Sequence, residues 1–337
     1  QGVPTDSTDQ RLSVTIEAAD VEVQPLATMP ALTAPRALVR LEGGAVEVSF
    51  PEATALVGPG KAIAVKAGRF TAVDIFGDRP MGEIAFRASG ALAPVLEVLD
   101  RPPLGLVRDA GIAIDKLDGK VEANVRLTLP LIEALKASEI KVDAKARITD
   151  GRAKNLIGPY DVTGASLSID VGERAVEAKG DLILSGVLAK LSWQRILGAE
   201  AQQQPPVRLS AVLDNSDRNQ LGLDVNHIVQ GEVPVVLTVE TAGRSEPLVH
   251  LRADLTNTEM VLESLSWKKV PGRSAFVEFD VGTTRNGTEL RGFKVVGDTI
   301  AIDGAVTIGA DNKLKDFNFP SFTLDVVTNL AMQGHLR

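Results

Sequence analysis

Histidine is the side chain most often used for proton transfer and metal binding near neutral pH, and this sequence contains three. His227, His250 and His335 stand in no HxxxH, HExxH or HxH arrangement, so their spacing indicates no metal site. His250 falls on the polar side of an alternating segment and is interpreted as a surface residue. We therefore predict no metal centre and no histidine-based catalysis.

The common nucleophile and nucleotide motifs are missing as well. The sequence has no GxSxG, GxxxxGK[ST] or GxGxxG pattern and no cysteine. Residues 57–61 (VGPGK) lack the Ser or Thr that follows the lysine of a phosphate-binding loop, and they are interpreted as a turn. Asp214 and Asp217 lie in turn-like sequence, where aspartate ordinarily caps the chain. We predict a protein that is not an enzyme and has no cofactor; a lipid- or polysaccharide-modifying enzyme is a disfavoured alternative, and a nucleic-acid binder is disfavoured further.

The charge balance argues against nucleic acid as a partner. The chain carries 36 Lys and Arg against 44 Asp and Glu, a net charge of −8, and has no basic run of five residues. Binding through phosphate neutralisation would need the opposite balance. A net charge of this sign also does not attract anionic head groups at long range.

No membrane span is predicted, because no stretch of 18 consecutive apolar residues occurs. Residues 1–4 (QGVP) show neither the charged nor the apolar region of a signal peptide. We expect the sequence to be a piece of a longer chain, with any membrane anchor outside it.

The elements that would position any site are strands, because apolar and polar residues alternate along most of the chain. In residues 121–129 (VEANVRLTL), for example, every second side chain is apolar. Roughly 20 short runs of this kind, separated by Gly, Asp and Asn, favour an antiparallel all-β fold. The clearest runs cover residues 12–18, 37–48, 61–75, 82–88, 121–129, 140–148, 165–171, 174–193, 207–213, 232–240, 249–255, 275–281, 288–308 and 314–328.

Helical patterns are few and short. Residues 93–99 form one that ends before Pro102, residues 104–110 add a turn or two, and residues 217–225 form another. Residues 198–206 (GAEAQQQPP) are the best candidate for a linker.

The chain also shows an internal similarity. The segment that begins at Gly119 resembles the one that begins at Gly231, which indicates a repeat of roughly 110 residues. We predict three β modules: residues 1–118 with short helices near 93–110, residues 119–200, and residues 201–337 with a short helix near 217–225.

The apolar residues are mostly small and aliphatic, since aromatic residues are only 4% of the chain and hydrophobic residues are 44%. A closed sandwich usually fills its core with larger side chains, whereas an elongated, curved sheet with a partly open apolar groove suits Val, Ala, Leu and Ile. Such a wall would hold acyl chains, which gain roughly 0.8 kcal/mol per buried CH₂ group. The expected groove-lining residues are Val14, Ile16, Val121, Val125, Leu127, Ile140, Val142, Ile148, Leu182, Leu184, Val235, Leu237, Val249, Leu251, Leu255, Val277, Phe279, Ile302 and Val306.

Two segments resemble the YhdP-type members of the AsmA-like family. Residues 253–273 (ADLTNTEMVLESLSWKKVPGR) resemble the family's ADLT…L…L.W.K..G segment, and residues 90–104 (GALAPVLEVLDRPPL) resemble its VL..LD.PPL segment. Residues 184–193 fit the family's strand pair. These motifs are structural and contain no catalytic signature, so the resemblance transfers no catalytic residue to this chain.

The resemblance implies a long, repeating β-groove with an apolar lining. It implies a periplasmic segment of a protein anchored in the bacterial inner membrane, which binds phospholipid acyl chains and conducts lipids between the inner and outer membranes. Phospholipid and other envelope proteins would be its partners. The residues also leave open a closed β-sandwich or solenoid that serves as a scaffold or interaction module of the cell envelope.

Overall fold

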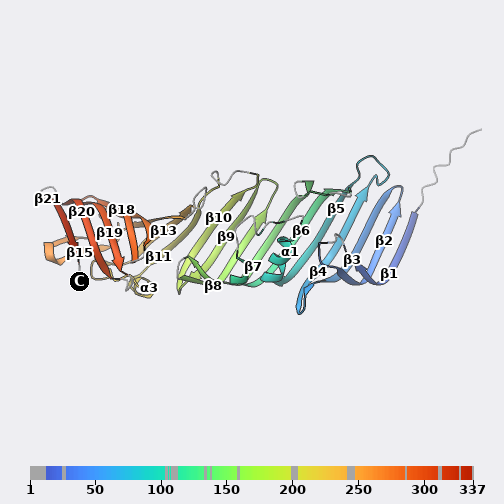
Figure 1. The fold of residues 1–337 in the computed structure, drawn as a ribbon, viewed down its shortest axis with the longest axis horizontal. Coiled ribbons are helices and arrows are strands. Elements are labelled where there is room, and N and C mark those ends of the chain that lie inside the picture. The colour runs from blue at the N-terminus through green and yellow to red at the C-terminus, as the bar shows by residue number, and fades with distance from the viewer. Residues whose placement is uncertain are drawn as a thin grey trace, which may run out of the picture. The chain divides into compact units, whose positions relative to one another are not determined.

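The described part of the chain folds mostly into antiparallel strands, which confirms the all-β prediction (Figure 1). Eighteen strands belong to one antiparallel sheet, and three short strands form a second sheet. Within the described part, no helix is both long and apolar enough to cross a bilayer. The computed structural model describes residues 13–24, 28–102, 105, 107, 113–132, 135–136, 139–157, 160–198, 204–240, 247–284, 287–309, 313–325 and 328–335.

The elements follow one another along the chain with short connections. The first are β1 (Ser13–Val23), β2 (Leu32–Glu42), β3 (Ala45–Gly58), β4 (Lys61–Val73), β5 (Met81–Ala91), α1 (Leu92–Leu99), η1 (Ile114–Lys116), β6 (Leu117–Pro130), β7 (Lys141–Ile157), β8 (Tyr160–Val171), β9 (Ala175–Leu184) and β10 (Val187–Ile196). The others are β11 (Val207–Leu213), α3 (Asn215–Gln220), β12 (Val229–Gln230), β13 (Val233–Glu240), β14 (Leu248–Asp254), β15 (Glu259–Leu262), η4 (Glu263–Leu265), β16 (Trp267–Lys269), β17 (Ala275–Thr284), β18 (Gly287–Gly297), β19 (Ile300–Gly309), β20 (Leu314–Leu324) and β21 (Thr328–His335).

The chain divides into two compact units. Unit 1 comprises residues 1–154 and 168–173, and unit 2 comprises residues 155–167 and 174–337. In unit 1, each strand from β1 to β7 pairs with the next one along the chain. The module boundaries at residues 118 and 200 stay predictions.

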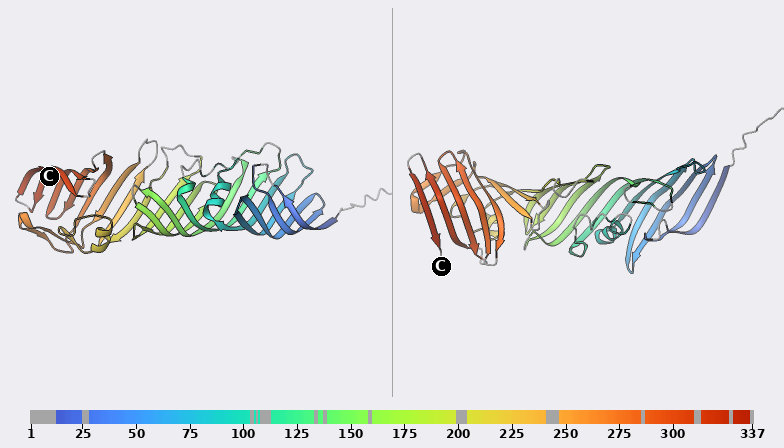
Figure 2. Two further views of the ribbon diagram at one scale, coloured as in Figure 1. Left: turned by 60° about the horizontal axis from the view of Figure 1, so that its bottom comes forward. Right: turned by 45° about the horizontal axis from the view of Figure 1, so that its top comes forward.

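Two segments of unit 2 leave the meander and then return to it. Between β11 and β13 the chain forms α3 and β12, and between β14 and β17 it forms β15, η4 and β16. Strands β12, β15 and β16 pair with one another into the second sheet, which we call the covering sheet. Figure 2 shows the orange covering sheet against the red strands β18–β21.

A β-bulge in β4 changes which side chains reach each face of unit 1. Lys66 pairs with Arg87 of β5, whereas Arg69 pairs with Ala85, so the extra residue brings Lys66 and Arg69 to the same face. Ala67 takes the left-handed conformation, with φ +50°, to make this shift.

The short helices are positioned by local signals. Helix α1 matches the prediction for residues 93–99 and begins one residue earlier. Helix α3 begins at Asn215, not at residue 217, because Asp214 and Asp217 form a capping box with each other's backbone N–H groups. It ends at Gln220, so the prediction of helix for residues 221–225 is wrong. Residues 59–60 form the predicted turn between β3 and β4. The helix predicted at 104–110 and the linker at 198–206 lie largely outside the described residues.

Candidate functional site

One face of unit 1 is apolar across all of its paired strands. Because directly opposed residues of antiparallel strands point to the same face, the pairing register assembles rows that run across the sheet. All members of one row are half-buried except Ile16, which is 53% exposed. From β1 to β7, this row contains Ile16, Val39, Val48, Phe70, Ile84, Leu127 and Val142.

The opposite face of the same strands is polar. Its adjacent row consists of Thr15, Arg40, Glu47, Thr71, Glu83, Thr128 and Lys141. The sheet of unit 1 therefore has one apolar face and one polar face. An apolar ligand could bind only on the apolar face.

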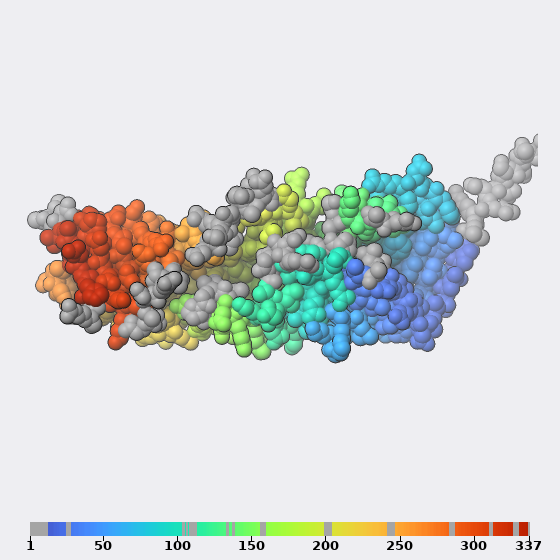
Figure 3. All heavy atoms as spheres, in the orientation of Figure 1, coloured from blue at the N-terminus to red at the C-terminus, as the bar shows by residue number. Residues whose placement is uncertain are grey.

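Helix α1 covers part of the apolar face of unit 1. Val95 and Val98 pack against a cluster of small and aliphatic side chains that includes Ala55, Ile63 and Val65 of β3 and β4. Figure 1 shows α1 in front of the strands of unit 1, and Figure 3 shows teal atoms of this part of the chain on the near face.

Two contacts hold α1 in this position. Glu97 forms an ion pair with Lys61, and the Arg101 guanidinium, just beyond the helix, donates a hydrogen bond of 3.0 Å to the carbonyl oxygen of Val57. Both partners belong to the β3–β4 hairpin, so that hairpin fixes the end of the helix.

Unit 2 also has an apolar row, with one residue from each of ten main-sheet strands, β9–β11, β13, β14 and β17–β21. The row contains Leu182, Ala189, Ala211, Val235, Ala253, Val277, Val295, Ile302, Phe322 and Leu330.

The covering sheet closes part of this apolar face of unit 2. Met260 and Trp267 are buried in one cluster with Ala253, Ala275 and Val295 of the main sheet, and Ala275 is completely inaccessible. The expected lining residues Val235, Leu251, Leu255, Val277 and Ile302 all belong to or pack against this cluster. These five side chains therefore pack against other residues of the protein.

Most of the aromatic residues lie in unit 2. Phe293 packs against Phe279 and Phe319 with ring centroids 5.9 and 5.7 Å away, and Phe319 packs against Phe317 and Phe322 at 5.3 and 6.3 Å. Five of the ten phenylalanines thus form one ladder across β17, β18 and β20. Unit 2 has the bulky core that the overall composition did not suggest.

The structure places most expected lining residues at sheltered positions. Ile16 is exposed, and Ile140 and Leu255 lie just outside strands. The buried ones are Val121, Ile148, Leu182, Leu255 and Val306. The half-buried ones are Val14, Val125, Leu127, Ile140, Val142, Leu184, Val235, Leu237, Val249, Leu251, Val277, Phe279 and Ile302.

Comparison with known proteins identifies no family. No family model, no curated protein and no solved structure matches the chain. Function is therefore inferred from the chemistry of the faces and of the polar clusters.

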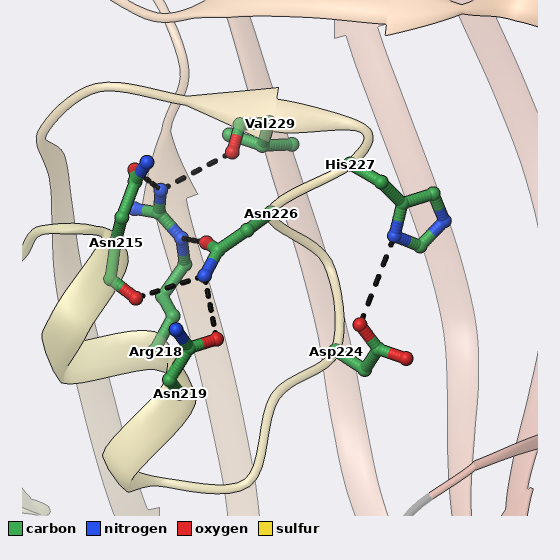
Figure 4. A network of polar contacts seen from close by, with 7 residues as sticks. All are labelled: Asn215, Arg218, Asn219, Asp224, Asn226, His227 and Val229. Atoms are coloured by element: carbon green, nitrogen blue, oxygen red, sulfur yellow. Dashed lines mark hydrogen bonds and ion pairs between the residues drawn. The ribbon is translucent and has the colours of Figure 1, made fainter.

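The most connected polar cluster surrounds Arg218 of α3 (Figure 4). Its guanidinium donates to the carbonyl oxygens of Leu213, Val229 and Gly231 and to the side chains of Asn215 and Asn226. Burial lowers the pKa of Arg218, and the nearby carboxylates of α3 oppose this effect. Since its donors are used by the protein, Arg218 ties α3 to β12 of the covering sheet.

A second buried cation fastens the other end of the covering sheet. Lys269 of β16 is 2% exposed, and its Nζ donates to the carbonyl oxygens of Thr256, Thr258 and Val270 at 3.1, 2.9 and 3.4 Å. Desolvation lowers the pKa of Lys269, and the negative charge of Asp254 partly offsets this effect. Hydrogen bonds from Thr256 in turn lower the pKa of Asp254. These groups tie β16, which contains Trp267, to the chain at residues 256–258.

The histidines form isolated pairs with single carboxylates. His250 Nδ1 lies 2.9 Å from Asp280 Oδ1, His335 pairs with Asp316, and His227 lies 3.8 Å from Asp224. In the described ranges, no group of three His, Asp or Glu side chains could hold a metal ion. His250 is partly exposed, in line with its interpretation as a surface residue.

Sequence reasoning missed the apolar residues that β2 to β5 contribute to unit 1, such as Val39, Val48 and Ile84. It also missed Arg218 and Lys269 as buried cations. The available signal for the first group was the alternation of residues 37–48 and 82–88, which was used to predict strands but not to select lining residues. No sequence signal marks a buried Lys or Arg, because ordinary surface residues have the same side chains.

Proposed function

We propose that the apolar face of unit 1 binds phospholipid acyl chains as part of a lipid-conducting groove in the cell envelope. The resemblance to AsmA-like proteins supplies the rest of this proposal: a periplasmic location, an inner-membrane anchor outside this sequence, and movement of lipids between the two membranes. The proposed groove is elongated and curved, and it needs no catalysis or cofactor.

The observation that carries the proposal is the apolar row of unit 1. It runs from Ile16 to Val142 without a polar member, and its residues keep part of their surface accessible. A closed core would bury such residues completely, whereas an acyl chain laid across them would remove their remaining apolar surface from water. Aliphatic walls form no hydrogen bonds, so they would accept acyl chains of different kinds.

The structure limits how far this binding face extends. Helix α1 occupies the part around Ile63 and Val65, and the covering sheet occupies the part of unit 2 around Ala275. The proposed contact with lipid is therefore strongest at Val125, Leu127 and Val142, outside the clusters that α1 and the covering sheet form.

A photo-crosslinking experiment tests the proposal. Benzoylphenylalanine replaces Val125 or Val142 on the apolar face, and Lys190 or Arg208, at exposed polar positions of unit 2, provide controls away from both proposed lipid-binding faces. After expression in bacteria and irradiation, mass spectrometry measures the phospholipid attached at each position. We expect adducts at Val125 and Val142 and none at the controls.

Equal labelling at all four positions, or none at any, would refute binding on this face. Lipid extraction from the unmodified protein gives a second measurement that needs no substitution. A protein that carries no phospholipid in either measurement would be better explained as a scaffold.

That second candidate function has its own support. The covering sheet gives unit 2 a closed core around Trp267 and Ala275, which is the construction of a rigid module that needs no ligand. A non-catalytic scaffold or interaction module of the envelope would use this core for stability and its polar faces for partners.

A further inference from the structure

The polar face of unit 1 gathers positive charge although the chain as a whole has a net charge of −8. Strands β4 to β7 present six cations in the middle of this face, against three acids, Glu83, Glu122 and Asp143. We call the six residues the cationic patch: Lys66, Arg69, Arg87, Arg126, Lys145 and Arg147.

The centre of the patch is a pair of like charges. Lys66 and Arg87 are directly opposed on β4 and β5, an arrangement that disfavours the sheet unless an anion neutralises it. Two more cations lie beside this pair. Arg69 of β4 and Arg126 of β6 are both directly opposed to Ala85 of β5, two residues from Arg87. Arg69 lies on this face by alternation with Thr71, and the bulge at Ala67 brings Lys66 to the same face.

The ion pairs within the protein do not neutralise this centre. Arg69 lies 3.8 Å from Glu47, Arg126 lies 3.4 Å from Glu83, and Lys145 lies 3.9 Å from Asp170. In the described ranges, Lys66, Arg87 and Arg147 form no ion pair, although Glu52 of β3 is opposed to Lys66. Exposed cations of this kind remain available to an external anion.

Exposed apolar side chains lie at the end of the same strands. Val73 of β4 and Met81 of β5 are directly opposed on the polar face and are 64% and 40% exposed. The loop between them carries Phe76, which is 83% exposed. The loop also carries Asp74 and Asp78, so the attraction to an anionic surface must come from the cations on the strands.

We infer that the polar face of β4–β7 docks on an anionic phospholipid bilayer. The cationic patch would contact lipid phosphates, while Phe76, Val73 and Met81 enter the interface, a combination typical of peripheral membrane contacts. An acidic protein would be attracted to the cations but would not require the exposed aromatic side chain. This surface is the opposite face from the proposed acyl site, so the two proposals can fail separately.

Vesicle sedimentation tests the inference with the full chain. Binding is measured to phosphatidylcholine vesicles with and without phosphatidylglycerol, at low and high salt. We expect binding only with phosphatidylglycerol, and a loss of about 30-fold in affinity for Lys66→Gln/Arg87→Gln, from about 1 kcal/mol per cation at an anionic surface. Phe76→Ser should lower binding about tenfold, with less dependence on salt.

Two controls separate this surface from other effects. Arg208→Gln/Lys294→Gln removes the same charge from exposed positions of unit 2 and should bind like the wild type. Leu188→Ser removes an apolar side chain of unit 2 that is 64% exposed and should also leave vesicle binding unchanged. The inference is overturned by absence of binding at low salt, by equal losses in the two double variants, or by patch-dependent binding to poly(L-glutamate) without binding to vesicles.

Discussion

Truncation of Trp267 to alanine should strongly destabilise unit 2, because this side chain joins the covering sheet to the main sheet. Trp267 is 6% exposed and lies in the same cluster as Met260 and Ala275. A buried tryptophan removes about 150–250 Å² from water, which corresponds to about 4–6 kcal/mol as an upper estimate. Truncations of this kind typically cost about 3–5 kcal/mol, so we expect a loss in that range.

Urea unfolding followed by far-ultraviolet circular dichroism measures this loss. Val270→Ala is the matched control, since its side chain is on the same segment but 52% exposed, and it should change the free energy of unfolding by less than about 0.5 kcal/mol. Because the chain has only two tryptophans, Trp193→Phe isolates the fluorescence of Trp267, which should be blue-shifted in the folded protein. A cost below about 1 kcal/mol with red-shifted emission would show that the covering sheet is not packed on the main sheet.

Three further substitutions test other parts of the structure. Arg218→Met should cost about 3 kcal/mol or more in thermal unfolding because it leaves three carbonyl oxygens unpaired, and Arg218→Lys should recover only part of this loss. The lowered pKa of Lys269 means that the unfolded chain binds more protons between that pKa and 10.5, so stability should rise with pH in this window. Lys269→Met should abolish that rise in urea titrations, and an unchanged slope would contradict the assignment. Gly68→Ala should destabilise unit 1 by about 1–3 kcal/mol, because the new Cβ would lie 2.0 Å from the Phe50 ring, whereas Gly58→Ala, with its nearest atom at 4.0 Å, should be nearly neutral in the same assay.

Alternation predicted the strands of this protein well because a strand with one sheltered face repeats every two residues. Residues 121–129 illustrate this agreement: they lie in β6 with Val121 buried and Glu122 exposed. The pattern could not separate the run 174–193 into β9 and β10, since Ser185 and Gly186 interrupt it for only two residues. It also could not distinguish the covering sheet from the main sheet, because β15 and β16 are too short to show a period.

The sequence predicted which residues make up the apolar faces, but not how much of each face other segments of the chain cover. Leu127 and Val142 were identified from alternation, and the register places them side by side. Whether an apolar residue faces an open surface or a closed core depends on which distant segment lies over it. Leu251 and Val125 have similar sequence surroundings, yet Leu251 packs against the Trp267 cluster and Val125 does not.

By itself, the sequence determined the fold class, the aliphatic character of the strand faces and the location of most strands, because these follow from local period and composition. Only the tertiary structure decided which strands are neighbours, and pairing register depends on contacts between residues far apart in the chain. That register collects Lys66, Arg87 and Lys145 into one patch on a protein with excess negative charge. It also places Trp267 over Ala275, where a count of aromatic residues would have suggested an empty interior.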